Sequence, residues 1–471
     1  MKIIGREHEQ AEFDRYMGSG KPEFLAVYGR RRVGKTFLIK EYFHGEFAFY
    51  ATGVANAGKR EQLENFHAAL NLHGGEDGRA PRDWRTAFLR LRKLLEADRR
   101  PGKKVVFLDE MPWMDTQKSG FVSALELFWN GWADARPDIL LIVCGSASAW
   151  MLNKLIRSHG GLHGRVTQTM RIEPFSLREC RAYFRAEGMA ISDYQVLEYY
   201  MALGGVPYYL SLVNPALSFA QNIDALCFAK GARLRGEFRE IYASLFKGEG
   251  RHEGIVRAIA LKAKGLTRGE IAAAAKIADG GHLTKALDEL EVSGFIRKYR
   301  PYGKKARGQL YQLTDFYSNF YLRFIEDSGE DETDYWAKQQ NTPAHAAWTG
   351  YAFEQVCLAH IAQIKQGLGI SGILAPVSSW RSERADPGAQ VDLVIDRSDG
   401  VVDLCEMKYA PGEFVIDKSY DLRLRNRITA FAAECPKRKA VRIVMVTTFG
   451  LRQNEYSSGY PARVTMGDLF A

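Results

Sequence analysis

Short apolar runs followed by polar turns organise the first third of the chain. Residues Phe24–Tyr28, Val105–Leu108 and Asp138–Ser148 are rich in Val, Leu, Ile and Phe and show little alternation with polar residues. Runs of this kind are typical of parallel strands that are covered on both faces. The segment that begins at Lys35 reads as a helix. The pattern therefore predicts an α/β domain with a parallel sheet over residues 1–172.

The apolar period changes in the middle of the chain. Residues 173–245 read as helices and predict a helical lid. Three further helices follow: one ends at Gly265, one is capped by Thr267 with a glutamate three positions later, and one is opened by Gly280. Two strands around a basic turn come next. This order predicts a winged helix-turn-helix over residues 246–330.

The last third returns to strands after an acidic stretch, Ile325–Asp334, which predicts an exposed linker. An amphipathic helix containing Glu354 comes first. Two apolar runs around an Asp-Gly turn, Val391–Tyr409, then predict a β-hairpin. Residues 335–471 are therefore expected to form a further α/β domain.

Composition limits the compartment and the partners. The 471 residues are 46% hydrophobic and 26% charged, which is typical of a soluble globular protein. The net charge of +9 favours a polyanionic partner only mildly, because 56 acidic residues offset 65 basic ones. Six cysteines without CxxC spacing predict neither a zinc site nor a disulfide framework. With no signal-peptide pattern and no long apolar stretch, we expect a cytoplasmic protein that does not enter a membrane.

A glycine-bounded loop after the first strand carries the most specific motif. Residues 29–36 read Gly-Arg-Arg-Arg-Val-Gly-Lys-Thr and satisfy G-x-x-x-x-G-K-[ST] between a strand and a helix. The backbone of such a loop binds phosphates, Lys35 reaches the β- and γ-phosphates, and the Thr36 hydroxyl coordinates Mg²⁺. The motif predicts an ATP site that includes Gly29 and Gly34. A chance glycine-rich turn is the alternative.

The second apolar run ends in two acids and the third in a serine. We expect Asp109 to bind Mg²⁺, directly or through water, and Glu110 to polarise the attacking water, as in a Walker B strand. Ser146 would contact the γ-phosphate or this water, because open α/β sheets bind ligands at the carboxyl ends of their strands. Ordinary strand-end side chains are the alternative for all three residues.

The first half of the chain resembles archaeal-type ATPases of the AAA+/STAND group of P-loop NTPases. The likeness is carried by IIGREHEQAEF, YGRRRVGKTFLI, VVFLDEMPWM, VCGSASAWM, GGLHGRVTQTMRIEPFSLRE and ALGGVPYYL. It implies that Gly5 and Arg6 lie near the adenine. It also implies that Arg165 is an arginine finger and that Pro207 belongs to the lid of the nucleotide site. A finger acting between subunits would require a homo-oligomer, whereas spacing alone leaves Arg165 as a surface cation.

The basic turn of the predicted winged helix is a candidate nucleic-acid contact. It carries three cations, Lys304, Lys305 and Arg307, which are suited to phosphate contacts. The third helix offers three acidic residues against the single Lys285, which is a poor surface for a polyanion. A packing module between domains is the alternative.

The hairpin of the last third places charges in apolar strands. Glu406 and Lys408 are two apart and share one face, and Asp392 stands in the partner strand. With Glu354 on the preceding helix, this set resembles the PD-(D/E)xK nuclease superfamily. The resemblance implies catalytic Mg²⁺ held by Asp392 and Glu406, with Lys408 beside the nucleophilic water. Glu354 would be an additional ligand, and Gln390 stands where many members have another acid. A solvated sheet face is the alternative.

The fold class expected for the whole chain is multidomain α/β. It comprises a P-loop NTPase sheet with a helical lid, a winged helix-turn-helix and a restriction-endonuclease-like domain. The function expected is an ATP-hydrolysing switch or motor coupled to an Mg²⁺-dependent nuclease that acts on DNA or, as the other substrate class, RNA. One alternative is a signalling NTPase whose nuclease-like domain binds nucleic acid or protein without cleaving it. A defence effector that acts on RNA is another.

Overall fold

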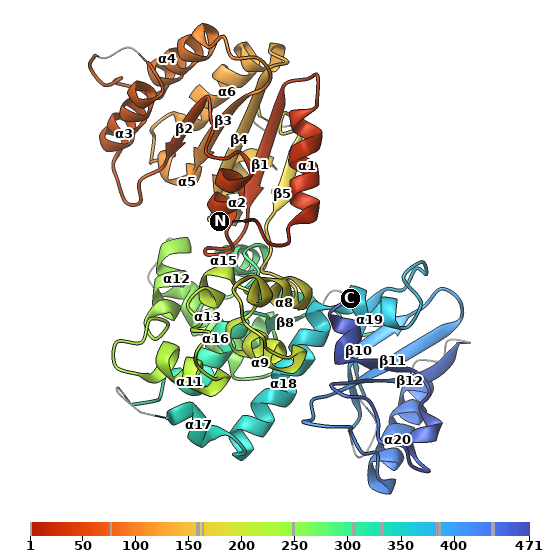
Figure 1. The fold of residues 1–471 in the computed structure, drawn as a ribbon. Helices are drawn as coiled ribbons and strands as arrows, with labels where there is room; N and C mark the ends of the chain where they lie inside the picture. The colour runs from red at the N-terminus through yellow and green to blue at the C-terminus, as the bar shows by residue number, and fades with distance from the viewer. Residues whose placement is uncertain are drawn as a thin grey trace. The chain divides into compact units, whose positions relative to one another are not determined.

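The chain forms two units in the computed structural model (Figure 1), Met1–Pro174 and Phe175–Ala471, and each is described by itself. The structure describes residues 2–75, 78–156, 161–162, 164–246, 250–303, 308–329, 334–382, 384, 388–434 and 439–471. The finer division of the second unit into lid, winged helix and nuclease-like domain stays a prediction.

A five-stranded parallel sheet is the centre of the first unit (Figure 1). In the spatial order β2-β3-β4-β1-β5, its strands are β2 (Phe49–Thr52), β3 (Lys104–Asp109), β4 (Ile139–Gly145), β1 (Glu23–Tyr28) and β5 (Gln168–Arg171). The three apolar runs of the sequence form β1, β3 and β4, which are almost entirely buried. The predicted parallel sheet is confirmed, and the carboxyl ends of these three strands lie side by side.

Helices cover both faces of this sheet (Figure 1). One face packs against α3 (Lys59–Leu72), α4 (Trp84–Ala97) and α6 (Phe121–Gly131). The other face packs against α1 (Glu7–Met17) and α2 (Lys35–Tyr42). Burial on both faces explains why the strands read as unbroken apolar runs. The remaining short helices are α5 (Met111–Met114), η1 (Ala133–Ala135), α7 (Ser148–Trp150) and η2 (Met151–Ile156).

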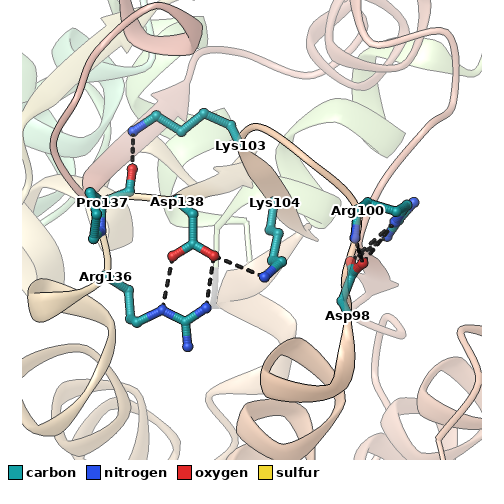
Figure 2. A network of polar contacts seen from close by, with 7 residues as sticks. All are labelled: Asp98, Arg100, Lys103, Lys104, Arg136, Pro137 and Asp138. Carbon is teal, nitrogen blue, oxygen red and sulfur yellow. Dashed lines mark hydrogen bonds and ion pairs between the residues drawn. The ribbon is translucent and has the colours of Figure 1, made fainter.

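A polar network joins the amino ends of β3 and β4 (Figure 2). The Asp138 carboxylate accepts hydrogen bonds from Arg136 at 2.7 and 2.8 Å and from the Nζ of Lys104 at 2.9 Å. The Nζ of Lys103 donates to the carbonyl of Pro137 at 2.8 Å. The Arg136 hydrogen bonds, followed by that of Lys104, hold the pKa of Asp138 well below its usual range, although partial burial opposes this. The network therefore stabilises the sheet at the edge opposite the strand carboxyl ends.

We expect Asp138→Asn to lower the free energy of unfolding by about 1 kcal/mol at pH 7, because it removes the charge from a partly exposed network. A carboxyl group whose pKa is depressed in the folded state stabilises the fold above its unfolded pKa of about 3.9. That contribution is lost as the pH falls through the folded pKa. Thermal unfolding midpoints at pH 7 and pH 3 measure the effect, which should shrink at the lower pH.

Asp98→Asn is the matched control, because Asp98 pairs with Arg100 only two residues away in the chain (Figure 2). This substitution should have a smaller effect at pH 7 than Asp138→Asn. An Asp138→Asn effect of equal size at both pH values would contradict the assignment of the network charge.

Helices begin the second unit, as the sequence predicts. They are α8 (Leu177–Ala186), α9 (Asp193–Leu203), α10 (Pro207–Leu210), α11 (Phe219–Ile223), η3 (Asp224–Phe228) and α12 (Glu237–Leu245). Serine caps fix several of their starts, and Ser176 with Glu179 forms a complete capping box at α8. Their apolar faces join one core cluster that continues through the unit.

Three helices and a small antiparallel sheet follow. These elements are α13 (Arg251–Ala260), β6 (Leu266–Thr267), α14 (Arg268–Ala274), α15 (Gly281–Val292), β7 (Ile296–Tyr299) and β8 (Leu310–Leu313), and the strand order is β6-β8-β7. The predicted Thr267 cap is confirmed as a capping box. The prediction that the preceding helix ends at Gly265 is wrong: α13 ends at Ala260, because residues 261–265 form a turn in which the Gly265 amide donates to the Lys262 carbonyl at 2.8 Å.

Three short helices connect this sheet to the last part of the chain, α16 (Phe316–Phe320), η5 (Tyr321–Ile325) and α17 (Tyr335–Gln339). The acidic stretch Ile325–Asp334 is predicted to be an exposed linker, but its first two residues pack or pair with other parts of the unit. Ile325 is buried in the core, and Glu326 forms an ion pair with Arg257. Both residues are therefore anchored, although the composition of the stretch is typical of a linker.

A second five-stranded sheet, of mixed direction, ends the chain. Its order is β13-β12-β11-β10-β9, with strands β9 (Val377–Arg381), β10 (Gln390–Asp396), β11 (Val401–Lys408), β12 (Ala440–Thr447) and β13 (Arg463–Thr465). The predicted hairpin is confirmed as the antiparallel pair β10–β11, while β11, β12 and β13 run parallel. The associated helices are α18 (Pro343–Ala359), α19 (Ile361–Gly367), α20 (Lys418–Glu434), η6 (Ser457–Gly459) and α21 (Met466–Leu469).

Among the described residues, none of the helices combines the length and the apolar character needed to cross a membrane. Five of the six cysteines are free and buried; the sixth, Cys435, lies outside the described residues.

Candidate functional site

The glycine-bounded loop between β1 and α2 wraps around its own lysine. Gly34 has φ of 86°, a left-handed conformation that favours glycine, and it leads directly into α2. A Cβ on Gly29 would lie 2.2 Å from the Ile172 carbonyl oxygen, so this position also requires glycine. The buried Nζ of Lys35 donates to the carbonyls of Gly29 at 3.0 Å and Arg30 at 2.9 Å. The loop therefore has the conformation of a phosphate-binding loop, with its lysine held at the centre.

Thr36 and Asp109 form the second part of the site. The Thr36 hydroxyl donates to the two carboxylate oxygens of Asp109 at 2.9 and 3.1 Å. Asp109 ends β3 and is 3% exposed, and burial raises its pKa even though the Thr36 hydrogen bond lowers it. A hydroxyl and a carboxylate in contact supply the hard oxygen atoms that Mg²⁺ prefers. The predicted pair of Mg²⁺ ligands is therefore brought together.

Glu110 and Ser146 connect this pair to the lysine. The Ser146 hydroxyl donates to Glu110 at 2.6 Å and accepts a hydrogen bond from Lys35 Nζ at 3.0 Å. The Ser146 amide donates to the other Glu110 oxygen at 3.2 Å. Glu110 has φ of 43°, a left-handed conformation that is rare for a non-glycine residue and that occurs at functional sites. Lys35, Ser146 and Glu110 thus form one hydrogen-bonded chain across the strand ends.

Ser146→Ala should lower the rate of ATP hydrolysis about tenfold, because it removes one charge-assisted hydrogen bond to Glu110. ATP affinity should change little, since Lys35 and the loop backbone keep their positions. Steady-state hydrolysis and equilibrium binding of a fluorescent ATP analogue separate the two quantities. A loss of binding as large as the loss of rate would contradict a role for Ser146 in positioning Glu110.

The amino-terminal segment reaches the same loop. Arg6 is buried, and its guanidinium donates to the carbonyls of Glu173 at 2.7 Å and Val33 at 3.4 Å. The carbonyl of the adjacent Gly5 accepts a hydrogen bond from Gln10. The structure therefore places Gly5 and Arg6 beside the phosphate loop, while their contact with adenine stays a prediction.

Two residues of the predicted nucleotide site are not brought to it by the described contacts. Arg165 precedes β5, is about half-exposed and pairs with Asp134 at 2.9 Å. Asp134 precedes β4, so this pair lies at the amino ends of the strands, opposite the loop. Pro207 begins α10 in the second unit. A finger role for Arg165 toward another copy of the chain, and a lid role for Pro207, stay predictions.

The charged face of the β10–β11 hairpin is a second candidate site. The paired register of β10 and β11 ends with Leu393 opposite Cys405, and Asp392 and Glu406 are the next residues of the two strands. Lys408 pairs with Glu406, and Asp392, Glu406 and Lys408 all shift the pKa of Glu354, so these three charges lie close together. Gln390 adjoins these charges, because its amide nitrogen donates to Asp392. The predicted set of charges is therefore brought together.

Glu406 is 8% exposed and has three polar partners. It accepts hydrogen bonds from Tyr420 and Arg427 of α20 and pairs with Lys408 at 3.1 Å. Burial opposes its ionisation, but Lys408 and then Arg427, with the hydrogen bonds of Arg427 and Tyr420, bring its pKa below the usual range. Glu406 is therefore a carboxylate held between two cations.

Glu354 of α18 faces the same charges from the neighbouring helix. Burial raises its pKa to about 8, Asp392 and Glu406 add to this, and Lys408 and Lys264 oppose it. Glu354 is thus protonated at neutral pH and can donate a hydrogen bond. No group of three or more His, Cys, Asp and Glu side chains in the described part of the chain is arranged to hold a metal ion. The role of Glu354 as an additional ligand beside Asp392 and Glu406 stays a prediction.

The three wing cations lie outside the described residues, but the residues before them are in contact with the last sheet. Pro301 forms a parallel bridge with Ser379 of β9, and the Tyr302 hydroxyl donates to Asp396 at 3.2 Å. The Tyr302 ring packs on Phe431 of α20 with a centroid distance of 5.1 Å. Residues 301 and 302, which precede the predicted wing, are therefore fixed against the last sheet.

Sequence reasoning missed several groups around the second site. Tyr420 and Arg427 are seven residues apart on α20, a spacing that places them on one helix face. That spacing is a usable signal, although it does not specify Glu406 as the partner. Sequence reasoning also missed Arg297 of β7. Its guanidinium donates to Gln355 of α18 at 2.8 Å, and burial lowers its pKa. Its position depends on packing between distant segments.

The fold and the first site together define a P-loop NTPase domain. Residues 21–181 match the family model described as "AAA domain". The first unit is therefore an ATPase domain of the AAA type.

Similar proteins occur in archaea. A protein of Methanocaldococcus jannaschii, "Uncharacterized protein MJECL04", is 24% identical over 398 residues, which are 83% of this chain and 84% of that protein. The Walker-type ATPase PABY2304 of Pyrococcus abyssi has a solved structure that is 19% identical; the match covers 68% of this chain and 96% of that chain with a TM-score of 0.50. The ORC2 protein of Aeropyrum pernix in ADPNP–ADP complexes is 15% identical, with 72% and 95% coverage and a TM-score of 0.42. The likeness to the Pyrococcus structure shows a shared fold and no more.

Proposed function

We propose that the chain is an ATP-hydrolysing switch or motor whose last domain, residues 335–471, is a metal-dependent DNA nuclease. The observation that carries the proposal is the presence of two assembled charge sets in one chain. One set joins Lys35 to Glu110 through Ser146. The other brings Asp392, Glu406 and Lys408 close together beside Glu354.

Hydrolysis follows from the first set. The loop backbone and Lys35 would bind the phosphates of ATP, and Thr36 with Asp109 would hold Mg²⁺, which neutralises charge on the transferring phosphoryl group. Glu110 lies on the far side of Ser146 from Lys35, where its carboxylate can orient a water molecule and accept its proton. Ser146 keeps the two charged groups in fixed relation. This role assignment requires no residue outside the first unit.

The second set has the residue types that phosphodiester cleavage needs. Asp392 and Glu406 supply oxygen ligands of the kind that Mg²⁺ or Mn²⁺ takes, and the bound ion would lower the pKa of a water nucleophile. The Gln390 Oε1 atom is buried without a hydrogen-bond partner among the described residues, so it is an unused acceptor next to Asp392. Lys408 can stabilise negative charge developing on the phosphate. Glu354 lies near the same charges, and its protonated form can donate a hydrogen bond to a phosphate oxygen.

A second candidate function is supported by the contacts of Glu406. Its oxygens already accept hydrogen bonds from Tyr420 and Arg427, and these would have to rearrange for Glu406 to bind a metal ion. In this reading the last domain binds nucleic acid or protein without cleaving it, and ATP drives changes in binding.

Incubation of the purified chain with plasmid and single-stranded DNA tests the proposal. Mg²⁺ or Mn²⁺ is supplied, with and without ATP, and EDTA is the metal-removal control. Products that require the metal ion support the nuclease. ATP hydrolysis with no products under any of these conditions would support the non-cleaving alternative instead.

A further inference from the structure

A pocket of about 80 Å³ lies between the middle sheet and the last sheet of the second unit. Its walls come from the turn after α13 and from β7 on one side, and from β9 and β10 on the other. The lining includes Lys262, Lys264, Tyr299, Ser379, Arg381 and Gln390. One water molecule occupies about 30 Å³ in the liquid. The pocket therefore admits a group of a few heavy atoms.

The lining is basic, and two of its three cationic side chains have no ion-pair or hydrogen-bond partner among the described residues. Lys262 pairs with Glu270 at 3.0 Å. The side chains of Lys264 and Arg381, in contrast, form no ion pair or hydrogen bond with any other residue that the structure describes. Lys264 and Arg381 line the same small volume from different elements, so an anion bound there would be attracted to both. The pocket is therefore suited to a small anion.

The pocket adjoins the carboxylates of the second candidate site. Gln390 lines the pocket and donates to Asp392. The pKa of Tyr299, another lining residue, is raised to about 12, first by burial, with Asp392 among the further contributors. The charge of Lys264 lowers the pKa of Glu354, so Lys264 also interacts electrostatically with this residue of α18. An anion in the pocket would thus lie beside Asp392.

The two walls are fixed relative to each other by contacts that do not involve the pocket cations. The amide of Tyr302 donates to the Ser379 carbonyl at 2.5 Å, next to the Pro301–Ser379 bridge. Arg297 of β7 reaches Gln355 of α18 from the same sheet. These contacts pre-form the pocket, which lowers the entropy cost of binding.

We propose that this pocket binds one backbone phosphate of a nucleic-acid strand, next to the phosphodiester that lies at Asp392. The assignment rests on the proposed nucleic-acid function of the last domain and specifies where that domain holds its substrate. Recognition is by charge, through Lys264 and Arg381, so it is independent of sequence. The middle sheet, which contributes Lys264 and Tyr299, is thereby part of the substrate site.

Binding of a labelled short single-stranded DNA, measured by fluorescence polarisation in EDTA, tests the proposal without requiring cleavage. The double variant Lys264→Gln/Arg381→Gln should weaken binding about tenfold at about 0.1 M salt and make the slope of log K against log salt shallower by about 1. The control variant Lys276→Gln/Lys285→Gln removes the same number of exposed charges from the middle region outside the pocket. It should change affinity by less than about twofold.

Two further binding measurements separate an effect of charge from an effect of altered structure, and binding of a strand from binding of free phosphate. The charge-conserving variant Lys264→Arg/Arg381→Lys should bind within about threefold of the parent if charge is the determinant. Inorganic phosphate, at matched ionic strength, should not displace the strand. Unchanged affinity of the first double variant, an equal loss in the control, a loss in the charge-conserving variant, or full displacement by phosphate would each overturn the proposal. A parent that binds in this way but never cleaves would refute the nuclease and leave the pocket assignment intact.

Discussion

Lys35→Ala should lower the rate of ATP hydrolysis by about 100- to 1,000-fold, the effect expected when one preorganised donor to a transition-state charge is removed. Lys35 is the only side chain that joins the loop carbonyls of Gly29 and Arg30 to Ser146 among the contacts of the described residues. Its removal takes away the cation that would bind the phosphates of ATP. It also removes the lysine end of the hydrogen-bonded chain that runs through Ser146 to Glu110. Phosphate release at saturating ATP and Mg²⁺ measures the effect.

Lys40→Ala is the matched control, because Lys40 lies on the same helix and stacks its ammonium on the Tyr50 ring at 4.2 Å, away from the loop. The control should hydrolyse ATP within about twofold of the parent, since a cation–π contact affects stability and not the site. If both variants retained full activity, the phosphate-binding role of the loop lysine would be wrong.

If the proposed nuclease is correct, Asp392→Ala should abolish DNA cleavage, with a loss of about 1,000-fold or more, because it removes one of the two carboxylates that would hold the catalytic metal ion. It also leaves Gln390 without the carboxylate that its amide nitrogen contacts. ATP hydrolysis without DNA should stay at the parent rate, because Asp392 lies in the second unit and the Walker residues lie in the first. Nicking of supercoiled plasmid in Mg²⁺ or Mn²⁺ measures the cleavage rate.

Asp399 supplies the control for this substitution. It lies at the turn of the same hairpin and pairs with Arg397, so Asp399→Ala removes the same chemical group from the same pair of strands. Cleavage by the control should be close to the parent rate. Cleavage by Asp392→Ala at the parent rate would place the catalytic site elsewhere.

The parts of the fold that the sequence predicts well are those in which burial leaves a pattern. β1, β3 and β4 are buried on both faces and read as unbroken apolar runs. β5, Gln168–Arg171, is a short edge strand with mostly polar residues, and its conformation depends on pairing with β1. β9 is similar, with exposed positions and two serines. Such strands are specified by their neighbours in the sheet rather than by their own side chains.

The same distinction applies to the sites. Lys35, Thr36 and Asp109 are recognisable because a strand, a tight loop and a helix constrain which residues can stand at each position. The contacts of Glu406 with Tyr420 and Arg427 arise from packing of α20 on the sheet, which no local spacing encodes. The pocket walls come from segments more than 100 residues apart, between Lys264 and Gln390. Their proximity is a property of the tertiary fold.

The rate of DNA cleavage with and without ATP, measured in the parent and in Lys35→Ala, tests the coupling of the two sites most directly. If nucleotide state controls the nuclease, the ratio of the two rates should differ clearly from one in the parent and return to one in Lys35→Ala. A parent that cleaves DNA at the same rate with and without ATP would contradict the coupling. The absence of any metal-dependent cleavage, with ATP still hydrolysed, would contradict the nuclease itself.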